Sequence, residues 1–255
     1  MTFQQRFAQS DDAAQMMARA REAVRVDASG ASLGALVELL MLRRTADRRI
    51  AVADSTPRGR LLRRLLASSR LFVSEGPCGA IHRPAGGNAA ADAASNDFAK
   101  TFQTQLVAVG VQATAAGRLS AALHELLTNI DEHAGDAVDG LGAFEVLDRE
   151  AWMVVADSGR GVRAGYAESP LPAKPATAEE ALTWAVIDNR SRTGDPHRGL
   201  GFRSVIQSVR SLDGCVRVRS DSASLELVQA ADRPKFLVRE QGHLRGFVVS
   251  VLLRW

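Results

Sequence analysis

Three polar residues recur at four-residue intervals near the middle of the chain. Glu125, Asn129 and His133 are spaced so that, on a helix, they follow one face and advance by roughly 40° per step. A carboxylate and a carboxamide on such a face can offer oxygen ligands to Mg²⁺ and a base to a water molecule. An ordinary polar helix flank would have the same spacing. His124 opens the zinc-protease pattern H-E-x-x-H, but Thr128 occupies its fifth position, which excludes that class.

A second group of residues follows an apolar run. Residues Trp152–Ala156 have the composition of a buried strand, and Asp157, Gly159 and Gly161 come directly after it. Glycines permit close backbone approach and positive φ, and a buried aspartate can accept a hydrogen bond from an exocyclic amine. A plain turn after a strand is the alternative. A Rossmann motif is less favoured, because no helix start signal follows and no acid stands where a ribose contact is expected.

A third pattern, Arg198-Gly199-Leu200-Gly201, precedes an amphipathic segment that begins at Phe202. Backbone N–H groups at a glycine-rich helix start form a phosphate site, and Arg198 adds a permanent cation. Taken by itself, this pattern is more typical of a simple loop.

Together and in this order, E-x-x-x-N-x-x-x-H-A, D-x-G-x-G and R-G-L-G make residues 98–255 resemble the GHKL superfamily. This superfamily contains the ATP-binding domains of gyrases, heat-shock chaperones, histidine kinases and mismatch-repair proteins. The resemblance implies an α+β protein with a Bergerat fold, a two-layer sandwich of helices and a mixed sheet. It also implies that ATP and Mg²⁺ bind between the helices and the sheet.

The resemblance implies a role for each motif residue. By it, Glu125 is the catalytic base, Asn129 is a ligand of Mg²⁺ and Asp157 contacts the adenine. The other implied nucleotide contacts are His133, Gly159, Gly161, Arg198, Gly199, Leu200 and Gly201. Among these, the two glycines of D-x-G-x-G belong to the adenine pocket and R-G-L-G belongs to the triphosphate cradle. Residues 163–197 would form a lid over the ATP, and their four prolines and scarce apolar residues outside 178–188 predict few contacts that hold this lid closed.

Residues 129–134, which read N-I-D-E-H-A, are more similar to the anti-sigma-factor serine kinases and related regulators than to sensor histidine kinases. Sensor histidine kinases usually carry Lys where Glu132 stands. One departure from the superfamily is that Leu244–Phe247 lacks the Gly-Thr that often precedes the final strand.

The function implied by this resemblance is that of an ATP-binding regulatory protein. It would phosphorylate Ser or Thr of a partner protein, or switch its grip on that partner with ATP. The expected partner is another regulator, such as an antagonist of the STAS type. A non-enzymatic interaction module with a structural nucleotide or none is the alternative, and a slow Mg²⁺-dependent ATPase is the third hypothesis. The sequence leaves the partner's identity and the oligomeric state open, a homodimer included.

The elements that must position these residues follow from hydrophobic periodicity. Helices are expected at 3–22, 33–46, 98–109, 114–134 and 178–188, after Pro57 and from Phe202. Strands are expected at 23–26, 49–53, 143–147, 152–156, 215–219, 224–229 and 246–254.

These elements predict two domains separated by a linker. Residues 1–75 would form a small α/β domain with a partial similarity to the STAS fold, and residues 98–255 would form the ATP-binding domain. Residues 76–97 are rich in Gly, Ala, Pro and Asn without periodicity, which predicts a linker. Between Arg43 and Arg70, nine arginines accompany only two acids, which would form an anion-binding surface or the charged faces of two amphipathic helices.

Composition excludes several classes of protein. The chain has 255 residues, of which 46% are hydrophobic and 24% charged, as in globular proteins with a packed core. A net charge of +3 gives no reason to expect binding to nucleic acid or membranes. The two cysteines lack the spacing of a disulfide framework or zinc site, and the most apolar stretch, Ala35–Leu42, is far shorter than the roughly 20 residues of a membrane span. These features predict a cytoplasmic protein.

Overall fold

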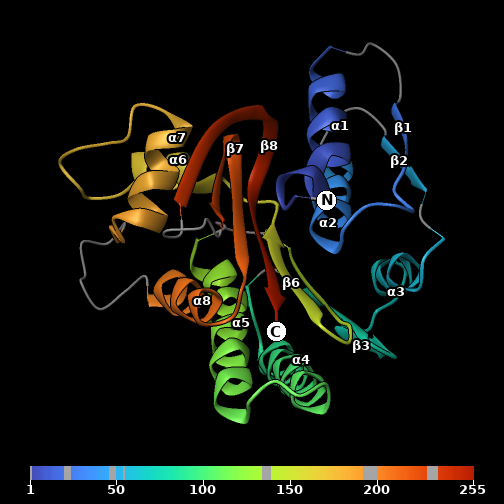
Figure 1. Cartoon of the computed structure of the whole chain (residues 1–255). Coiled ribbons are helices and arrows are strands. Elements are labelled where there is room, and N and C mark those ends of the chain that lie inside the picture. The colour runs from blue at the N-terminus through green and yellow to red at the C-terminus, as the bar shows by residue number, and fades with distance from the viewer. Residues whose placement is uncertain are drawn as a thin grey trace.

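In the computed structural model, which describes residues 2–19, 24–45, 50–53, 55–84, 86–133, 139–191, 200–228 and 235–255, the central feature is a six-stranded sheet (Figure 1). Its strands, in spatial order, are β3 (Phe72–Glu75), β4 (Cys78–Arg83), β5 (Gly140–Val146), β6 (Glu150–Asp157), β8 (Lys235–Arg254) and β7 (Cys215–Val228). Every neighbouring pair is antiparallel. The predicted α+β class is therefore confirmed, whereas the sheet is antiparallel rather than mixed.

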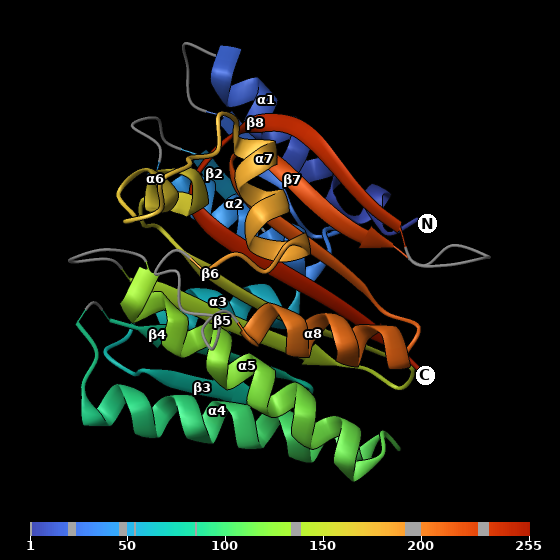
Figure 2. The same ribbon diagram turned by 90° about the vertical axis from the view of Figure 1, so that its left-hand side faces the viewer.

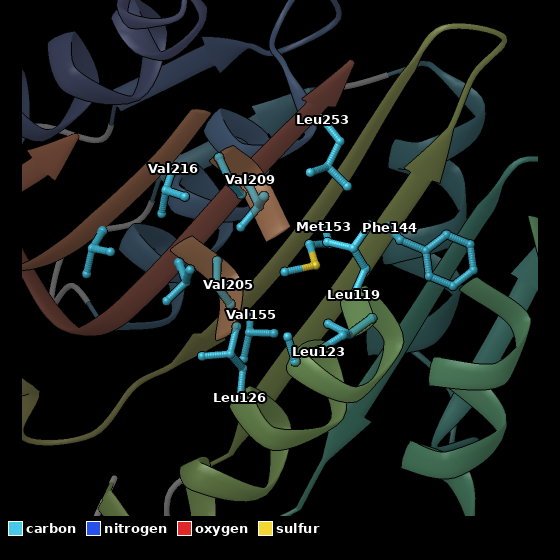
Figure 3. Packing of buried hydrophobic residues seen from close by; sticks show 14 of the residues in the cluster. Leu119, Leu123, Leu126, Phe144, Met153, Val155, Val205, Val209, Val216 and Leu253 are labelled. Atoms are coloured by element: carbon cyan, nitrogen blue, oxygen red, sulfur yellow. The ribbon is translucent and has the colours of Figure 1, made fainter. Parts of the chain in front are cut away.

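Three helices cover one face of this sheet, as seen in the foreground of Figure 2. They are α4 (Ala89–Ala108), α5 (Ala113–His133) and α8 (Leu200–Ser211). The apolar stripe of α5, with Leu119, Leu123 and Leu126, packs in one cluster with Met153 and Val155 of β6 (Figure 3). The predicted helices at 114–134 and from Phe202 are confirmed within two residues at their starts, because their apolar residues keep helical spacing over several turns.

The N-terminal segments cover the opposite face. They are the 3₁₀ turn η1 (Gln4–Phe7), α1 (Ala8–Arg19), α2 (Leu33–Thr45) and α3 (Pro57–Leu66). Phe7 and Leu36 share a second apolar cluster with Trp152 and Val154 of β6. Beside these helices, β1 (Val24–Asp27) and β2 (Ile50–Ala53) form a separate parallel pair. Helices therefore lie on both faces of the sheet, which makes three layers rather than the two expected.

The ribbon formed by β7 and β8 extends beyond the other strands and carries the remaining helical segments (Figure 1). These are α6 (Gly161–Ala167), α7 (Ala178–Leu182) and the π-helical turn η2 (Thr183–Ile187). Residues 178–188 were expected to be helical, which α7 and η2 confirm. The helix α6 was not expected, and the predicted strands at 215–219 and 224–229 are one strand interrupted by register shifts.

The prediction of a linker at residues 76–97 is wrong in local structure. Residues 78–83 form β4, which pairs with both β3 and β5, and α4 begins at Ala89. Glycine at position 79 is required by packing, because a Cβ there would overlap the ring of Phe144. Asn88 caps α4 by accepting a hydrogen bond from the N–H of Ala91. The small residues that predicted a linker thus belong to a strand packed against an aromatic ring and to the first turns of a capped helix.

Within the described residues, no helix combines the length and the apolar character that a membrane span requires.

Candidate functional site

The end of β6 is flanked by residues from three other strands. Asp157 pairs with Gly140 of β5 on one side and with Phe247 of β8 on the other, and Phe247 in turn pairs with Ser220 of β7. Because side chains alternate along a strand, Asp157 lies on the same face as Met153 and Val155, the face covered by α5 and α8. Gly140, Asp157, Phe247 and Ser220 form a row of paired residues across the sheet. We call it the acceptor row because it contains the Asp157 carboxylate.

The last turns of α5 lie against one end of the acceptor row. A Cβ built on Gly140 would overlap the δ1 methyl of Ile130, so this helix passes directly over the strand beside Asp157. Asn129 precedes Ile130, and Glu125 lies one turn earlier on the same helix; both side chains are half-buried. His133 is the last residue of α5, and its side chain falls outside the described part of the structure.

The first turn of α8 lies at the other side of Asp157. The ring of Phe202 meets the ring of Phe247 edge to face, with centroids 5.7 Å apart and planes at 87°. Leu200 and Gly201 are the two residues that start this helix. Arg198 and Gly199, the first half of the R-G-L-G pattern, lie outside the described residues. The structure thus brings the E-x-x-x-N flank, Asp157 and the start of α8 to one end of the sheet.

Asp157 carries an unusual charge environment. Its Oδ1 accepts the N–H of Gly159 at 2.8 Å, and its side chain is almost wholly buried. Burial raises the pKa of Asp157 from its ordinary 3.8 to about 6, and the N–H of Gly159 only partly opposes this effect. Across the described ranges of the chain, no Arg, Lys or His forms an ion pair with this carboxylate. It is therefore a buried hydrogen-bond acceptor with capacity to spare.

The two glycines after Asp157, Gly159 and Gly161, differ in backbone conformation and in contacts. Gly161 has φ of +77° and begins α6, and a Cβ there would lie 2.8 Å from Ser220 Oγ. Gly159 is buried and donates to Asp157, but its φ is not positive. A helix does follow the D-x-G-x-G motif, contrary to the expectation from sequence. The antiparallel sheet nevertheless excludes the Rossmann alternative, which requires parallel strands.

Two residues that the sequence interpretation missed complete the surroundings of Asp157. Gly246 has φ of +91°, and a Cβ there would overlap the carbonyl oxygen of Asp157. Ser220 is buried and bonds to the strand that carries this glycine. The only signal in the sequence was a glycine within the final apolar strand, which often marks a bulge or a close backbone approach.

The segment expected to form a lid has a small core of its own. Tyr166 of α6 packs edge to face on Trp184 of η2, with centroids 5.7 Å apart, and Ala181 completes the cluster. The guanidinium of Arg190 stacks 4.4 Å from the Trp184 ring, and Tyr166 donates its hydroxyl proton to the carbonyl of Arg190. The segment is therefore packed internally up to Ser191, and the prediction that few contacts hold it closed over a ligand stays a prediction. Residues 192–199 lie outside the described ranges.

The carboxamide of Asn129 offers an oxygen donor that a nucleotide-bound Mg²⁺ can use. Among the described side chains, no group of three or more His, Cys, Asp or Glu residues is arranged to hold a metal ion. Mg²⁺ in phosphate sites typically keeps several waters and takes only one or two ligands from the protein. The carboxamide oxygen of Asn129 fits that requirement.

Neither a scan against protein-family models nor a search of curated proteins gives a match to this chain. The fold and the acceptor row therefore define an α+β protein with a buried carboxylate site between two helices and a helix-bearing ribbon.

Proposed function

We propose that this chain is a GHKL-class, ATP-binding regulator with a Bergerat-type nucleotide site at the end of β6. The observation that carries the proposal is the buried carboxylate of Asp157, which has no cationic partner among the described residues and lies where α5, the D-x-G-x-G turn and α8 converge. A buried acceptor of this kind is costly unless a donor satisfies it. The exocyclic amine of adenine is such a donor.

Each of the remaining residues has a task in this proposal. The N–H groups at the start of α8 and the guanidinium of Arg198 bind the phosphates, and the carboxamide of Asn129 holds Mg²⁺. Mg²⁺ supplies charge neutralisation at the phosphate oxygens. Glu125, half-buried on the same helix as Asn129, takes the proton of the attacking hydroxyl.

The proposed reaction is transfer of the γ-phosphoryl group to a Ser or Thr of a partner protein. If transfer does not occur, ATP acts as the ligand that changes the affinity of this chain for that partner. The two versions share the same binding site and differ only in whether a phosphoprotein is formed.

Calorimetric titration with ATP in the presence of Mg²⁺ tests the binding site. Asp157→Asn and Asn129→Ala are each expected to weaken binding, the first by roughly 1–3 kcal/mol because it places an amide donor against the adenine amine. Asp148→Asn is the matched control, since Asp148 is exposed in the turn at the opposite end of β6. Undiminished ATP binding in both site variants would remove the nucleotide proposal.

Incubation with γ-labelled ATP and proteins co-purified from the host tests the reaction. Label on a partner protein is expected for a kinase, free phosphate for an ATPase and neither for a binding regulator. Scoring binding, phosphate release and protein labelling separately distinguishes these outcomes.

A further inference from the structure

We infer that Ser220 is a positioning residue that couples the order of α6 to the position of Asp157. The role of this coupling in ligand binding rests on the proposed function, whereas the coupling itself rests on contacts around the β7–β8 bulge. Ser220 belongs to none of the three sequence motifs.

The hydroxyl group of Ser220 both accepts and donates a hydrogen bond. It accepts the N–H of Val162, the second residue of α6, at 3.0 Å and donates to the carbonyl of Gly246 on β8 at 2.7 Å. The side chain is 1% exposed, so no solvent competes for either bond. Removing the hydroxyl would leave a helix-terminal N–H and a strand carbonyl without this partner.

The Gly246 peptide in turn lies directly against Asp157. A Cβ on Gly246 would overlap the carbonyl oxygen of Asp157 and lie 2.9 Å from the Cα of Ser158. The next residue, Phe247, pairs with Asp157 in the sheet. A displacement of the Gly246 carbonyl therefore acts on the backbone that carries the buried carboxylate.

The pairing of β7 with β8 changes register beside the contact between Gly246 and Asp157, which lies at the end of β6. Ser220 pairs with Phe247 but Asp221 pairs with Leu244, so Arg245 and Gly246 have no opposite residue in β7. Bulges of this kind bend a ribbon and re-aim its side chains, commonly beside functional sites.

A second residue of this bulge, Asp221, also contacts α6. Asp221 adopts φ of +56°, and its carboxylate accepts Arg163 Nε at 3.0 Å while His243 Nδ1 lies at 2.9 Å. Ser220 and Asp221 thus fasten two successive residues of α6, Val162 and Arg163, to the β7–β8 ribbon.

The consequence is a reciprocal linkage between the carboxylate and the helix. A ligand that holds Asp157 in place also holds the Gly246 peptide and, through Ser220, the first turn of α6. By the same linkage, partners that order α6 raise the affinity of the ligand by an equal factor.

The chain contains a matched control for this inference. Ser224 lies on the same strand and is fully buried, but its hydroxyl has no hydrogen-bond partner among the described residues. Both Ser220→Ala and Ser224→Ala therefore delete a buried hydroxyl oxygen from β7. Only Ser220→Ala also removes the hydrogen bonds to Val162 and Gly246.

We expect Ser220→Ala to weaken ATP binding by about tenfold, which corresponds to about 1.4 kcal/mol, and Ser224→Ala to leave it unchanged. In the ligand-free protein, Ser220→Ala should accelerate hydrogen exchange at Val162 and also at Gly159, whose N–H bonds to Asp157. A purely structural role would lower the melting temperature without this paired local change. Asp221→Asn tolerates the positive φ and leaves the Ser220 hydroxyl in place, so by loosening α6 at Arg163 it should also accelerate exchange at Gly159, which keeps the test valid if Ser220→Ala does not fold.

Three results would overturn the inference: wild-type affinity in Ser220→Ala, equal effects in the two serine variants, or faster exchange at Val162 without any at Gly159. If the wild-type chain binds no adenine nucleotide, the proposed function fails and the exchange data alone decide whether Ser220 couples α6 to Asp157.

Discussion

At the scale of single residues, Asp157 shows a conflict between stability and binding. A carboxylate that is buried without a cation among the described residues costs free energy in the ligand-free protein. The same isolation makes it a strong and selective acceptor for a donor from a ligand. Such conflicts between local stability and use are typical of functional sites.

This conflict predicts opposite effects of Asp157→Asn on stability and on ATP binding. The pKa of Asp157 in the folded state is about 6 against an ordinary 3.8, so its contribution to stability is complete below about pH 4 and is lost as the pH rises through 6. The difference between a pKa of 3.8 and one of about 6 corresponds to about 3 kcal/mol in the free energy of unfolding. The variant should therefore unfold at higher urea than the wild type at pH 7.5, with the difference vanishing near pH 4, although it binds ATP more weakly. Equal stability at both pH values would contradict the assignment of a strained carboxylate.

Glu125 is expected to act after binding rather than in it. Glu125→Gln should retain ATP affinity and lose roughly 10² to 10⁴ in phosphoryl transfer, the usual contribution of a positioned base. The measurement is single-turnover labelling of the partner, or phosphate release if the chain is a hydrolase. An unchanged rate would show that the transfer proceeds without this carboxylate.

At the scale of elements, the two sides of the β7–β8 ribbon are held by different chemistry. The bulge holds α6 on one side, and buried charges bind the N-terminal helices on the other. Arg217 of β7 reaches Glu38 of α2 at 3.0 Å and Glu226 at 2.7 Å, and Arg219 reaches Glu38 at 2.8 Å and Asp11 of α1 at 3.0 Å. Both arginines and Glu38 are fully buried. These ion pairs fix the position of α1 and α2 on the sheet.

Loss of Glu38 should therefore be severe. Burial alone would raise the pKa of Glu38, but Arg217 and Arg219 outweigh it and hold the pKa below its ordinary value. Its contribution to stability is present above the ordinary pKa and is lost as the pH falls through the folded value. Glu38→Gln should lower the free energy of unfolding by about 3–5 kcal/mol, because it removes the fully buried one of the two carboxylates, Glu38 and Asp11, that pair with both buried guanidiniums.

Glu75→Gln is the control for this prediction. Glu75 also pairs with an arginine, Arg64 at 3.2 Å, but both side chains are more than half exposed. Exposed pairs contribute about 0–1 kcal/mol. Urea unfolding at pH 7 should separate the two variants clearly, and similar losses would mean that the buried pairs are not what anchors α2.

The segment 161–191 is expected to be ordered before any ligand binds. Trp184→Leu removes the ring that contacts both Tyr166 and Arg190 and should increase hydrogen exchange throughout α6 and α7. In the wild type, a non-hydrolysable ATP analogue should protect this segment more than ADP, because only the analogue carries a γ-phosphate. A ligand shifts the equilibrium between an open and a closed lid only by its differential affinity for the two states. Leu147→Ala, at an exposed position, controls for the loss of apolar surface. Identical protection in all ligand states would leave the proposed ATP site untouched but would contradict the proposal that the lid is a switch.

Elements with long, regular apolar patterns were predictable from sequence. The places where a glycine lets a ring or another strand come into close contact were not. The stripe of α5 and the strand before Asp157 follow directly from periodicity. The strand β4 did not, because Gly79 is selected by the Phe144 ring above it rather than by strand propensity. Likewise Asp157 was identifiable from its residue type and place, but Ser220 and Gly246 act through a bulge whose register no local pattern encodes.

At the scale of the whole molecule, the N-terminal helices belong to the same folded unit as the sheet. One buried cluster joins Phe7 and Leu36 to Trp152, Val154 and Leu252, residues of β6 and β8 that alternate with those facing α5. All but the first residue of β6 is buried because both of its faces are covered. An autonomous ATP-binding domain that starts after residue 75 would expose this face.

A chain that lacks residues 1–69 but keeps β3 should therefore not fold as a stable monomer. Its deletion uncovers the apolar face around Trp152 and Leu252 and removes Asp11 and Glu38 from two buried arginines. We expect aggregation on size-exclusion chromatography and loss of near-ultraviolet circular dichroism, with recovery when residues 1–69 are co-expressed. A monomeric fragment that unfolds cooperatively and binds ATP like the full chain would instead establish two independent domains. In that case the buried charges between α1, α2 and β7 would mark a docking surface between domains rather than the interior of one.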